Sequence, residues 1–162
     1  MRKVPSNNAS GADNQQERLG MSFWIAGFVD GEGCFTISVI KNKTTRFGRQ
    51  IFPEFVITQG LKSLKALEQI KEFFGCGSII RNKRHDNHNE DLYRYCVRSV
   101  QELHHTIIPF FRSFPLRTAK QKDFKLFSQV VQMMYKKEHL KKSGWNKILR
   151  IASQTNRKKI RS

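Results

Sequence analysis

Hydrophobic and polar residues alternate along several segments of the chain, and this period of two predicts β-strands. In the run at 34–40, the apolar residues at odd positions share one face. A second run covers 51–58, where Pro53 indicates an edge position or a bulge. The runs SIIRNK and LYRYCVRS stand on either side of a polar loop at 83–91, and together they predict a hairpin.

Apolar residues at intervals of three and four predict helices before, between and after these strands. The first helix is very apolar, with Ser22 as its N-cap and with Gly31 and Gly33 ending it. The third is expected to end at Pro109, because proline cannot continue the hydrogen bonding of a helix. The predicted helices are 22–30, 62–74, the part of 100–112 up to Pro109, 118–135 and 143–156.

The resulting order of elements, α-β-β-α-β-β-α-α-α, predicts the α+β class. We expect an αββαββα core with one four-stranded antiparallel sheet covered by helices, and extra C-terminal helices beyond it. One domain over residues 18–156 accommodates these elements and is long enough to bury a real core. The polar segment 1–17 is expected to be disordered, and 157–162 to form a basic tail.

The chain is strongly basic. Its 30 Lys and Arg residues face 13 Asp and Glu residues, so the formal net charge is +17. A positive field of this size indicates a polyanionic partner, but charge alone does not separate DNA from RNA. No apolar run approaches the ~20 residues of a membrane helix, and the N-terminal segment lacks the apolar stretch of a secretory signal. We therefore expect neither membrane binding nor secretion.

The cysteines and histidines suggest no metal site by their spacing. Cys34, Cys76 and Cys96 form no CxxC pair, and none of the five histidines has a partner at ligand spacing. Three cysteines in apolar settings are instead expected to be buried thiols in a reducing compartment.

One face of the predicted sheet is polar and basic. A sheet of this kind can lie in the major groove of DNA. An ordinary solvated face is the alternative, since most antiparallel sheets have one. The residues expected on this face include Thr36, Ser38, Gln50, Glu54, Arg94 and Arg98.

The most specific signal in the chain is the run from Ile25 to Gly33, which reads Ile-Ala-Gly-Phe-Val-Asp-Gly-Glu-Gly. Gly27 and Gly31 lie four residues apart on one helical face, where a second helix backbone could come very close. Two such helices packed across a twofold axis would bring two Glu32 carboxylates together. Like charges that close are unfavourable unless a cation lies between them, and hard oxygen ligands suit Mg²⁺ or Mn²⁺.

Position by position, and in its helix-then-strand context, this run resembles the LAGLIDADG signature of homing endonucleases. The resemblance implies site-specific cleavage of double-stranded DNA by metal-assisted phosphodiester hydrolysis, with Mg²⁺ as the cofactor and Mn²⁺ as a substitute. It implies a metal site at Glu32 and the adjacent Gly31. It also implies catalytic roles for Glu32, Gln59 and Lys120, with Lys122 as the nearby competitor of Lys120.

The sequence contains one copy of the motif, so the resemblance implies a homodimer. Ala26, Gly27, Asp30 and Gly31 are expected at the dimer interface, where Asp30 either caps backbone amides at the helix end or contacts the partner. The two sheets would form a saddle over a pseudo-palindromic target of about two helical turns. The residues expected to contact DNA are Thr36, Ser38, Ile40, Asn42, Arg46, Arg49, Gln50, Phe52, Glu54, Lys83, Arg84, Arg94, Arg98 and Lys122.

Three alternative functions stay open. An RNA maturase would assist splicing of its host intron and take intron RNA as its partner, although an intact Glu32 favours the nuclease. A regulator would use the same fold to bind DNA without cutting it. A structural RNA-binding protein would explain the charge but not the motif. Since proteins like this are carried by introns, we expect a mitochondrial or chloroplast location, or the bacterial cytoplasm.

Overall fold

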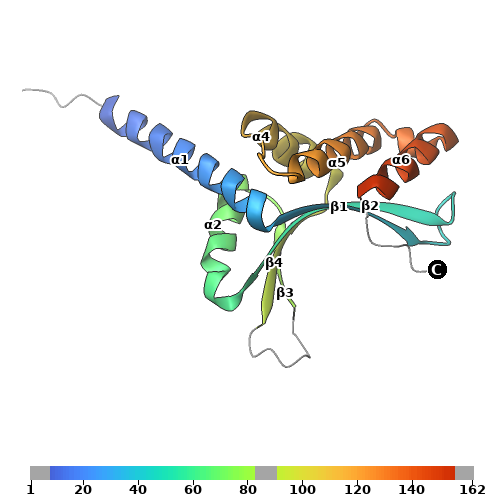
Figure 1. Cartoon of the computed structure of the whole chain (residues 1–162), viewed down its shortest axis with the longest axis horizontal. Coiled ribbons are helices and arrows are strands. Elements are labelled where there is room, and N and C mark those ends of the chain that lie inside the picture. The colour runs from blue at the N-terminus through green and yellow to red at the C-terminus, as the bar shows by residue number, and fades with distance from the viewer. Residues whose placement is uncertain (1–7, 83–90, 156–162) are drawn as a thin grey trace, which may run out of the picture.

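The computed structural model describes residues 8–82 and 91–155, in which a four-stranded sheet carries helices on one of its faces (Figure 1). This arrangement confirms the predicted α+β class with an αββαββα core. The strands are β1 (Gly33–Lys41), β2 (Arg49–Gly60), β3 (Ser78–Asn82) and β4 (Leu92–Val97). The helices are α1 (Asn8–Glu32), α2 (Leu64–Phe74), α3 (Val100–Glu102), α4 (Ile108–Ser113), α5 (Lys120–Tyr135) and α6 (Lys142–Thr155), with short turns η1 (Leu61–Ser63), η2 (Leu103–Ile107) and η3 (Glu138–Leu140).

The strands pair antiparallel in the order β1-β2-β4-β3, which makes β2 and β4 the central strands. Pro53 was predicted to mark an edge position or a bulge, and the pairing confirms a local edge there although β2 as a whole is a central strand. The pairing of β2 with β4 begins only at Phe55, opposite Val97, so at Pro53 the strand has a partner on the β1 side alone. A proline, which lacks an N–H, is tolerated there because one side of the strand is locally an edge.

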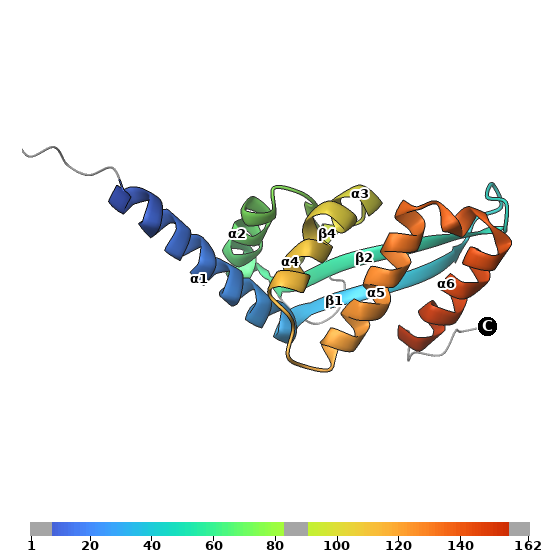
Figure 2. The same ribbon diagram turned by 90° about the horizontal axis from the view of Figure 1, so that it is seen from above.

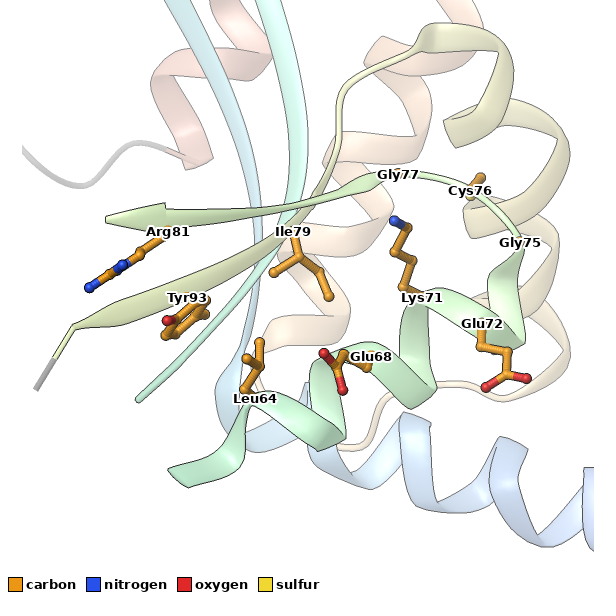
Figure 3. A pocket seen from close by; sticks show the side chains of 10 residues that line it. All are labelled: Leu64, Glu68, Lys71, Glu72, Gly75, Cys76, Gly77, Ile79, Arg81 and Tyr93. Atoms are coloured by element: carbon orange, nitrogen blue, oxygen red, sulfur yellow. The ribbon is translucent and has the colours of Figure 1, made fainter. Parts of the chain in front are cut away.

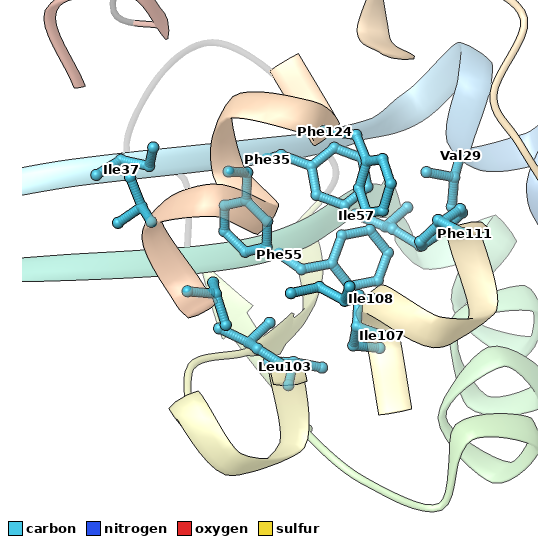
Figure 4. Packing of buried hydrophobic residues seen from close by; sticks show 14 of the residues in the cluster. Val29, Phe35, Ile37, Phe55, Ile57, Leu103, Ile107, Ile108, Phe111 and Phe124 are labelled. Atoms are coloured by element: carbon cyan, nitrogen blue, oxygen red, sulfur yellow. The ribbon is translucent and has the colours of Figure 1, made fainter. Parts of the chain in front are cut away.

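Aromatic side chains from the sheet and the helices form the centre of the core (Figure 4). Phe35 stacks on Phe55 with ring centroids 5.1 Å apart. Phe111 of α4 and Phe124 of α5 meet the ring of Phe35 edge-on at 5.4 and 5.3 Å. Truncating a buried Phe to Ala typically costs ~3–5 kcal/mol. This cluster therefore fixes α4 and α5 to one face of the sheet and leaves the other face open.

Helix α1 is much longer than the sequence pattern predicts. It begins at Asn8 and not at Ser22, so residues 8–17 are helical and the expected disordered tail to residue 17 is wrong over that part. The Ser22 Oγ donates to the Arg18 carbonyl at 2.9 Å inside the helix instead of capping it. The Arg18 guanidinium lies 5.3 Å over the Phe73 ring of α2 and so braces this segment. Figure 2 shows the first half of α1 extending beyond the sheet.

The N-terminal half of α1 escaped prediction because its residues are polar all round. Once the apolar half has nucleated the helix, each further residue adds a hydrogen bond at little cost, and Gln, Glu and Arg propagate a helix well. Although α1 has 25 residues, neither it nor any other helix among the described residues is long and apolar enough to cross a membrane.

The helix predicted to stop at Pro109 continues to Ser113, so that prediction is also wrong. After α3 the backbone widens into the π-turn η2, and Pro109 falls in the first turn of α4 behind it. A proline in the first turn of a helix is tolerated, because the N–H that it lacks would have no partner there.

The turn between β1 and β2 is anchored to the C-terminal part of the chain. Phe47 in this turn stacks on Trp145 of α6, with ring centroids 4.8 Å apart. Arg46 Nη1 donates to the carbonyl oxygen of Leu140 at 3.4 Å. The last helix therefore holds the far end of the two longest strands in place.

Candidate active site and nucleic-acid interface

Helix α1 delivers Glu32 to the surface at one end of the open sheet face. The chain passes from the helix into β1 at Gly33, where a Cβ atom would lie 2.6 Å from Val29 Cγ1 and 3.0 Å from the Val29 carbonyl oxygen. Only glycine allows this tight exit. The Glu32 side chain is exposed, and Gln59 Nε2, from the end of β2, donates to Glu32 Oε2 at 3.3 Å. The structure thus brings together two of the three predicted catalytic residues.

Lys120, at the start of α5, is the third. Its Nζ donates to the carbonyl oxygens of Val29 at 2.9 Å and Gly31 at 3.1 Å. These carbonyls belong to the last turn of α1, whose unpaired acceptors carry a partial negative charge that favours a cation. Lys122 has an exposed side chain. Of the two lysines, Lys120 is therefore the one that lies at the end of α1.

Asp30 joins the end of α1 to the segment that precedes α5. Its carboxylate accepts hydrogen bonds from the backbone N–H of Arg117 at 2.6 Å and from the Thr118 hydroxyl at 2.7 Å. Burial raises the pKa of Asp30, but the hydrogen bonds from Thr118 and Arg117 and the charge of Lys120 outweigh it and hold the pKa below its ordinary value. Asp30 does cap backbone amides, but they are those of the neighbouring segment and not of its own helix end.

Two glycines of the motif, Gly27 and Gly31, lie on an uncovered side of α1. A Cβ atom added to Gly27 or to Gly31 would meet nothing within 4 Å, and both residues are exposed. Phe23, on the same side one turn earlier, leaves 61% of its surface exposed. Ala26 is buried and contributes to the wall of a groove between α1 and residues 113–117. Within the described residues of one chain, no helix packs against this glycine side.

The oxygen atoms of Glu32 and Gly31 at the end of α1 are ligands that suit a hard divalent cation. The Glu32 carboxylate and the Gly31 carbonyl are oxygen ligands of the kind that Mg²⁺ prefers, whereas thiol and imidazole ligands are missing from their immediate set. The set is small, since no cluster of three or more His, Cys, Asp or Glu residues stands among the described residues. These oxygen atoms therefore fit Mg²⁺ in kind and would supply part of a coordination shell.

The open face of the sheet carries the side chains at even positions of β1 and β2, as the alternation predicts. On β1 the odd positions Phe35 and Ile37 are buried, while Thr36 and Ser38 point to the uncovered side. Polar contacts link some of these side chains to one another. Asn42 Nδ2 donates to Gln50 Oε1 at 2.9 Å, and Arg94 Nη2 donates to Glu54 Oε1 at 2.7 Å. The remaining predicted contact residues on this face are Ile40, Phe52 and Arg98.

Two more predicted contact residues, Arg46 and Arg49, lie away from the even positions of this face. Arg46 turns toward the Leu140 carbonyl, and its side chain also lies 5.6 Å over the Phe47 ring. Arg49 is exposed at the beginning of β2. Lys83 and Arg84 lie outside the residues that the structure describes.

Cys34 also lies on the open face of the sheet, although no role was predicted for it there. It is exposed, contrary to the expectation of buried thiols, and it sits two residues after Glu32. Partial burial of the sulfur raises the pKa of the thiol. The strand alternation that placed Thr36 and Ser38 on this face places Cys34 there as well, and it was the signal that could have found it.

A separate hollow of about 720 Å³ lies between α2 and the β3–β4 hairpin (Figure 3). Glu68, Lys71 and Glu72 of α2 form one wall, and Ile79 and Tyr93 form the floor. Its lining includes none of the predicted site residues, so the carboxylates of α2 provide controls for substitutions at the site.

Fold and site together define a class of α+β proteins in which an open, polar antiparallel sheet ends beside an acid-bearing helix, with a lysine and a glutamine at the acid. The family model described as LAGLIDADG endonuclease matches residues 25–131. The chain therefore belongs to the LAGLIDADG endonuclease family, as its signature predicts.

Two curated fungal proteins are similar in sequence to this chain. A 50.9 kDa protein in ND4 intron 1 of Podospora anserina is 37% identical over 122 residues, which are 74% of the chain and 26% of the relative. The probable intron-encoded endonuclease 3 of Neurospora crassa is 34% identical over 140 residues, 85% of the chain and 25% of the relative. The chain thus spans about a quarter of the length of these two relatives.

Solved structures share the fold. The homing endonuclease I-TnaI is 40% identical and superposes with a TM-score of 0.74 over 85% of this chain and 89% of its own. The LAGLIDADG homing endonuclease I-LtrWI, solved bound to target DNA, is 28% identical with a TM-score of 0.75 over 99% of this chain and 47% of its own. The alignment with I-TnaI shows that a family member of similar length adopts this architecture.

Proposed function

We propose that the chain is a site-specific endonuclease that cleaves both strands of a long pseudo-palindromic DNA target. One observation carries the proposal: Glu32, Gln59 and Lys120 meet at the end of a polar, open sheet face. Family membership and the homing endonucleases among its structural neighbours support it. The maturase alternative gains no support from these relatives.

Different residues of the site bind the DNA, hold the metal ion and stabilise the charge of the phosphate in this proposal. The open sheet face binds the duplex and sets the phosphodiester against Glu32, which with the Gly31 carbonyl would hold Mg²⁺, or Mn²⁺ in its place. When bound, the ion supplies Lewis acidity for the attacking water and the leaving oxygen. Gln59 orients the Glu32 carboxylate through its hydrogen bond. The Lys120 ammonium, fixed by two carbonyls, places a positive charge where the phosphate becomes more negative during attack.

The active form is a homodimer in this proposal. One chain presents one Glu32, and cutting both strands of DNA needs two such sites. The exposed glycine side of α1 offers a self-complementary surface on which two backbones can come close. Pairing across this side would set two Glu32 residues near the twofold axis and join two sheets into one saddle.

A cleavage assay tests the function. The purified chain is incubated with Mg²⁺ and a plasmid in which the DNA sequences flanking the reading frame are joined. We expect a single double-strand cut near that junction. The Glu32→Gln variant should bind the same duplex but lose cleavage, whereas Glu72→Gln, which removes an exposed carboxylate on α2, should cut normally. Full cleavage by Glu32→Gln would reject the proposed site.

The relatives named for introns support an organellar gene as the source of the chain. We propose that the protein acts in a mitochondrion or chloroplast. Mapping its reading frame to an intron of an organellar genome tests this location.

A further inference from the structure

We infer that Glu54 determines specificity by holding Arg94 and Arg98 in fixed orientations on the open sheet face, and that it lowers non-specific binding by keeping both cations away from phosphates. The inference rests on the proposed DNA-binding function and names a residue that sets its selectivity. Glu54 acts through the arginines, so it is a positioning residue.

Glu54 lies on the central strand β2, and both of its carboxylate oxygens are engaged. Oε1 accepts from Arg94 Nη2 at 2.7 Å, and Oε2 accepts from Arg98 Nε. Only 13% of the Glu54 side chain is exposed, against 30% for Arg94 and 44% for Arg98. The carboxylate is thus the inner member of the group, and the two guanidinium groups are its outer members.

The strand register shows that this contact fixes the direction of Arg94. Arg94 pairs with Thr58 on β2, four residues along the strand from Glu54. At ~3.3 Å per residue, that separation is about 13 Å along the sheet. The Arg94 side chain must therefore extend along the sheet face to reach Glu54. A free arginine would sample many directions instead, including those that lead to phosphates.

The contact leaves Arg94 able to read a base. A guanidinium group has five N–H donors in a fixed plane, and Glu54 uses only one nitrogen of Arg94. The remaining donors can form the paired contact to guanine O6 and N7, the commonest specific contact in the major groove. An arginine already held in one orientation loses less conformational entropy when it forms that contact.

The net charge of the three side chains also supports a role for Glu54 in limiting non-specific binding. The carboxylate offsets one of the two positive charges, so the three side chains together carry +1 instead of +2. Phosphate neutralisation controls non-specific binding, and the logarithmic salt slope grows by ~0.9 for each phosphate contact. Releasing Arg94 and Arg98 would therefore favour contacts that carry no sequence information, in both subunits of the proposed dimer.

The test compares Glu54→Gln with the wild type and with Glu68→Gln, an equal change of charge on α2. Dissociation constants are measured for the cognate duplex and a scrambled duplex at several salt concentrations, in Ca²⁺ so that binding is separated from cutting. For Glu54→Gln we expect tighter binding to the scrambled duplex, a steeper salt slope and at least a tenfold loss of the ratio between the two affinities. Glu68→Gln should keep the wild-type ratio.

Two outcomes would overturn the inference. An unchanged affinity ratio would show that Glu54 has no part in selectivity. Loss of cognate affinity with an unchanged scrambled affinity would show that Glu54 itself contacts a base. Should Glu54→Gln fail to fold, Glu54→Asp, which is too short to hold both arginines, should show the same changes to a smaller degree. Wild-type cleavage of the cognate plasmid is scored separately, so failure of the proposed function is distinguished from failure of this inference.

Discussion

At the scale of single residues, Lys120 is the group whose loss should affect cleavage more than binding. Its ammonium is held by the carbonyls of Val29 and Gly31, the second of which directly precedes Glu32 in the chain. Lys120→Met should lower the single-turnover cleavage rate by at least ~100-fold, the order expected for one lost electrostatic group. Its dissociation constant for DNA should stay within a few-fold of the wild type. Lys125→Met, at an exposed position of the same helix, is the control and should cut at nearly the wild-type rate.

Asp30 should stabilise the fold in a pH-dependent way. Its folded pKa lies below the ordinary 3.8, so the charged form is the stabilising one. The contribution is fully present above the unfolded pKa and is lost as pH falls through the lower folded value. Asp30→Asn should reduce the free energy of unfolding by about 1 kcal/mol at pH 7, as for other lost caps. Urea denaturation should show the difference unchanged down to about pH 5 and shrinking below pH 4; a difference that grows in acid would contradict the assignment.

The same scale shows where sequence reasoning stops. Strand alternation placed Glu54, Arg94 and Arg98 on one face, but it could not show that they bond to one another. That contact depends on β2 pairing with β4, a non-local register set by the hairpin and the core. Gln59 and Lys120 were predicted only through the family resemblance, because they lie 61 positions apart in the sequence and no local pattern connects them.

At the scale of elements, the packing of the β1–β2 turn on α6 should set how well the outer part of the target is read. The side chain of Phe47 is half-buried and stacks on the buried ring of Trp145. Phe47→Ala should cost about 1–2 kcal/mol of stability and loosen the turn without unfolding the core. Mismatches at the outermost base pairs should then be tolerated better, while central mismatches stay as harmful as before. Leu61→Ala, at an exposed position, is the control, and competition binding is the measurement.

Elements were predictable wherever one face is apolar. The helices at 62–74, 118–135 and 143–156 and the four strands appear within a few residues of their predicted bounds, because burial imposes a period on the sequence. The polar half of α1 has no apolar face, so the start of the helix at Asn8 could not be predicted from the sequence. The π-turn before Pro109 depends on packing, and the rule that proline ends a helix failed there.

At the scale of the whole molecule, subunit mixing should reveal a shared catalytic centre. If two chains each cut one strand, equal amounts of wild-type and Glu32→Gln chains should form about half mixed dimers by random pairing. Mixed dimers should convert supercoiled plasmid to the nicked form, whereas wild-type dimers should linearise it. Gel analysis of the products and sedimentation of the complex on DNA provide the measurement. A monomeric complex that linearises DNA would contradict the homodimer.

The length of β2 has a consequence for the genome in which such a protein works. Its 12 residues span about 40 Å, the rise of about 12 base pairs of B-DNA. Two such strands, one from each subunit, would read some twenty positions even with gaps. A target of twenty base pairs has roughly 10¹² possible sequences, far more than the ~10⁶–10⁹ competing sites of a genome. Rarity would then protect the host, because an enzyme that tolerates one or two mismatches would still find very few sites to cut besides its own locus.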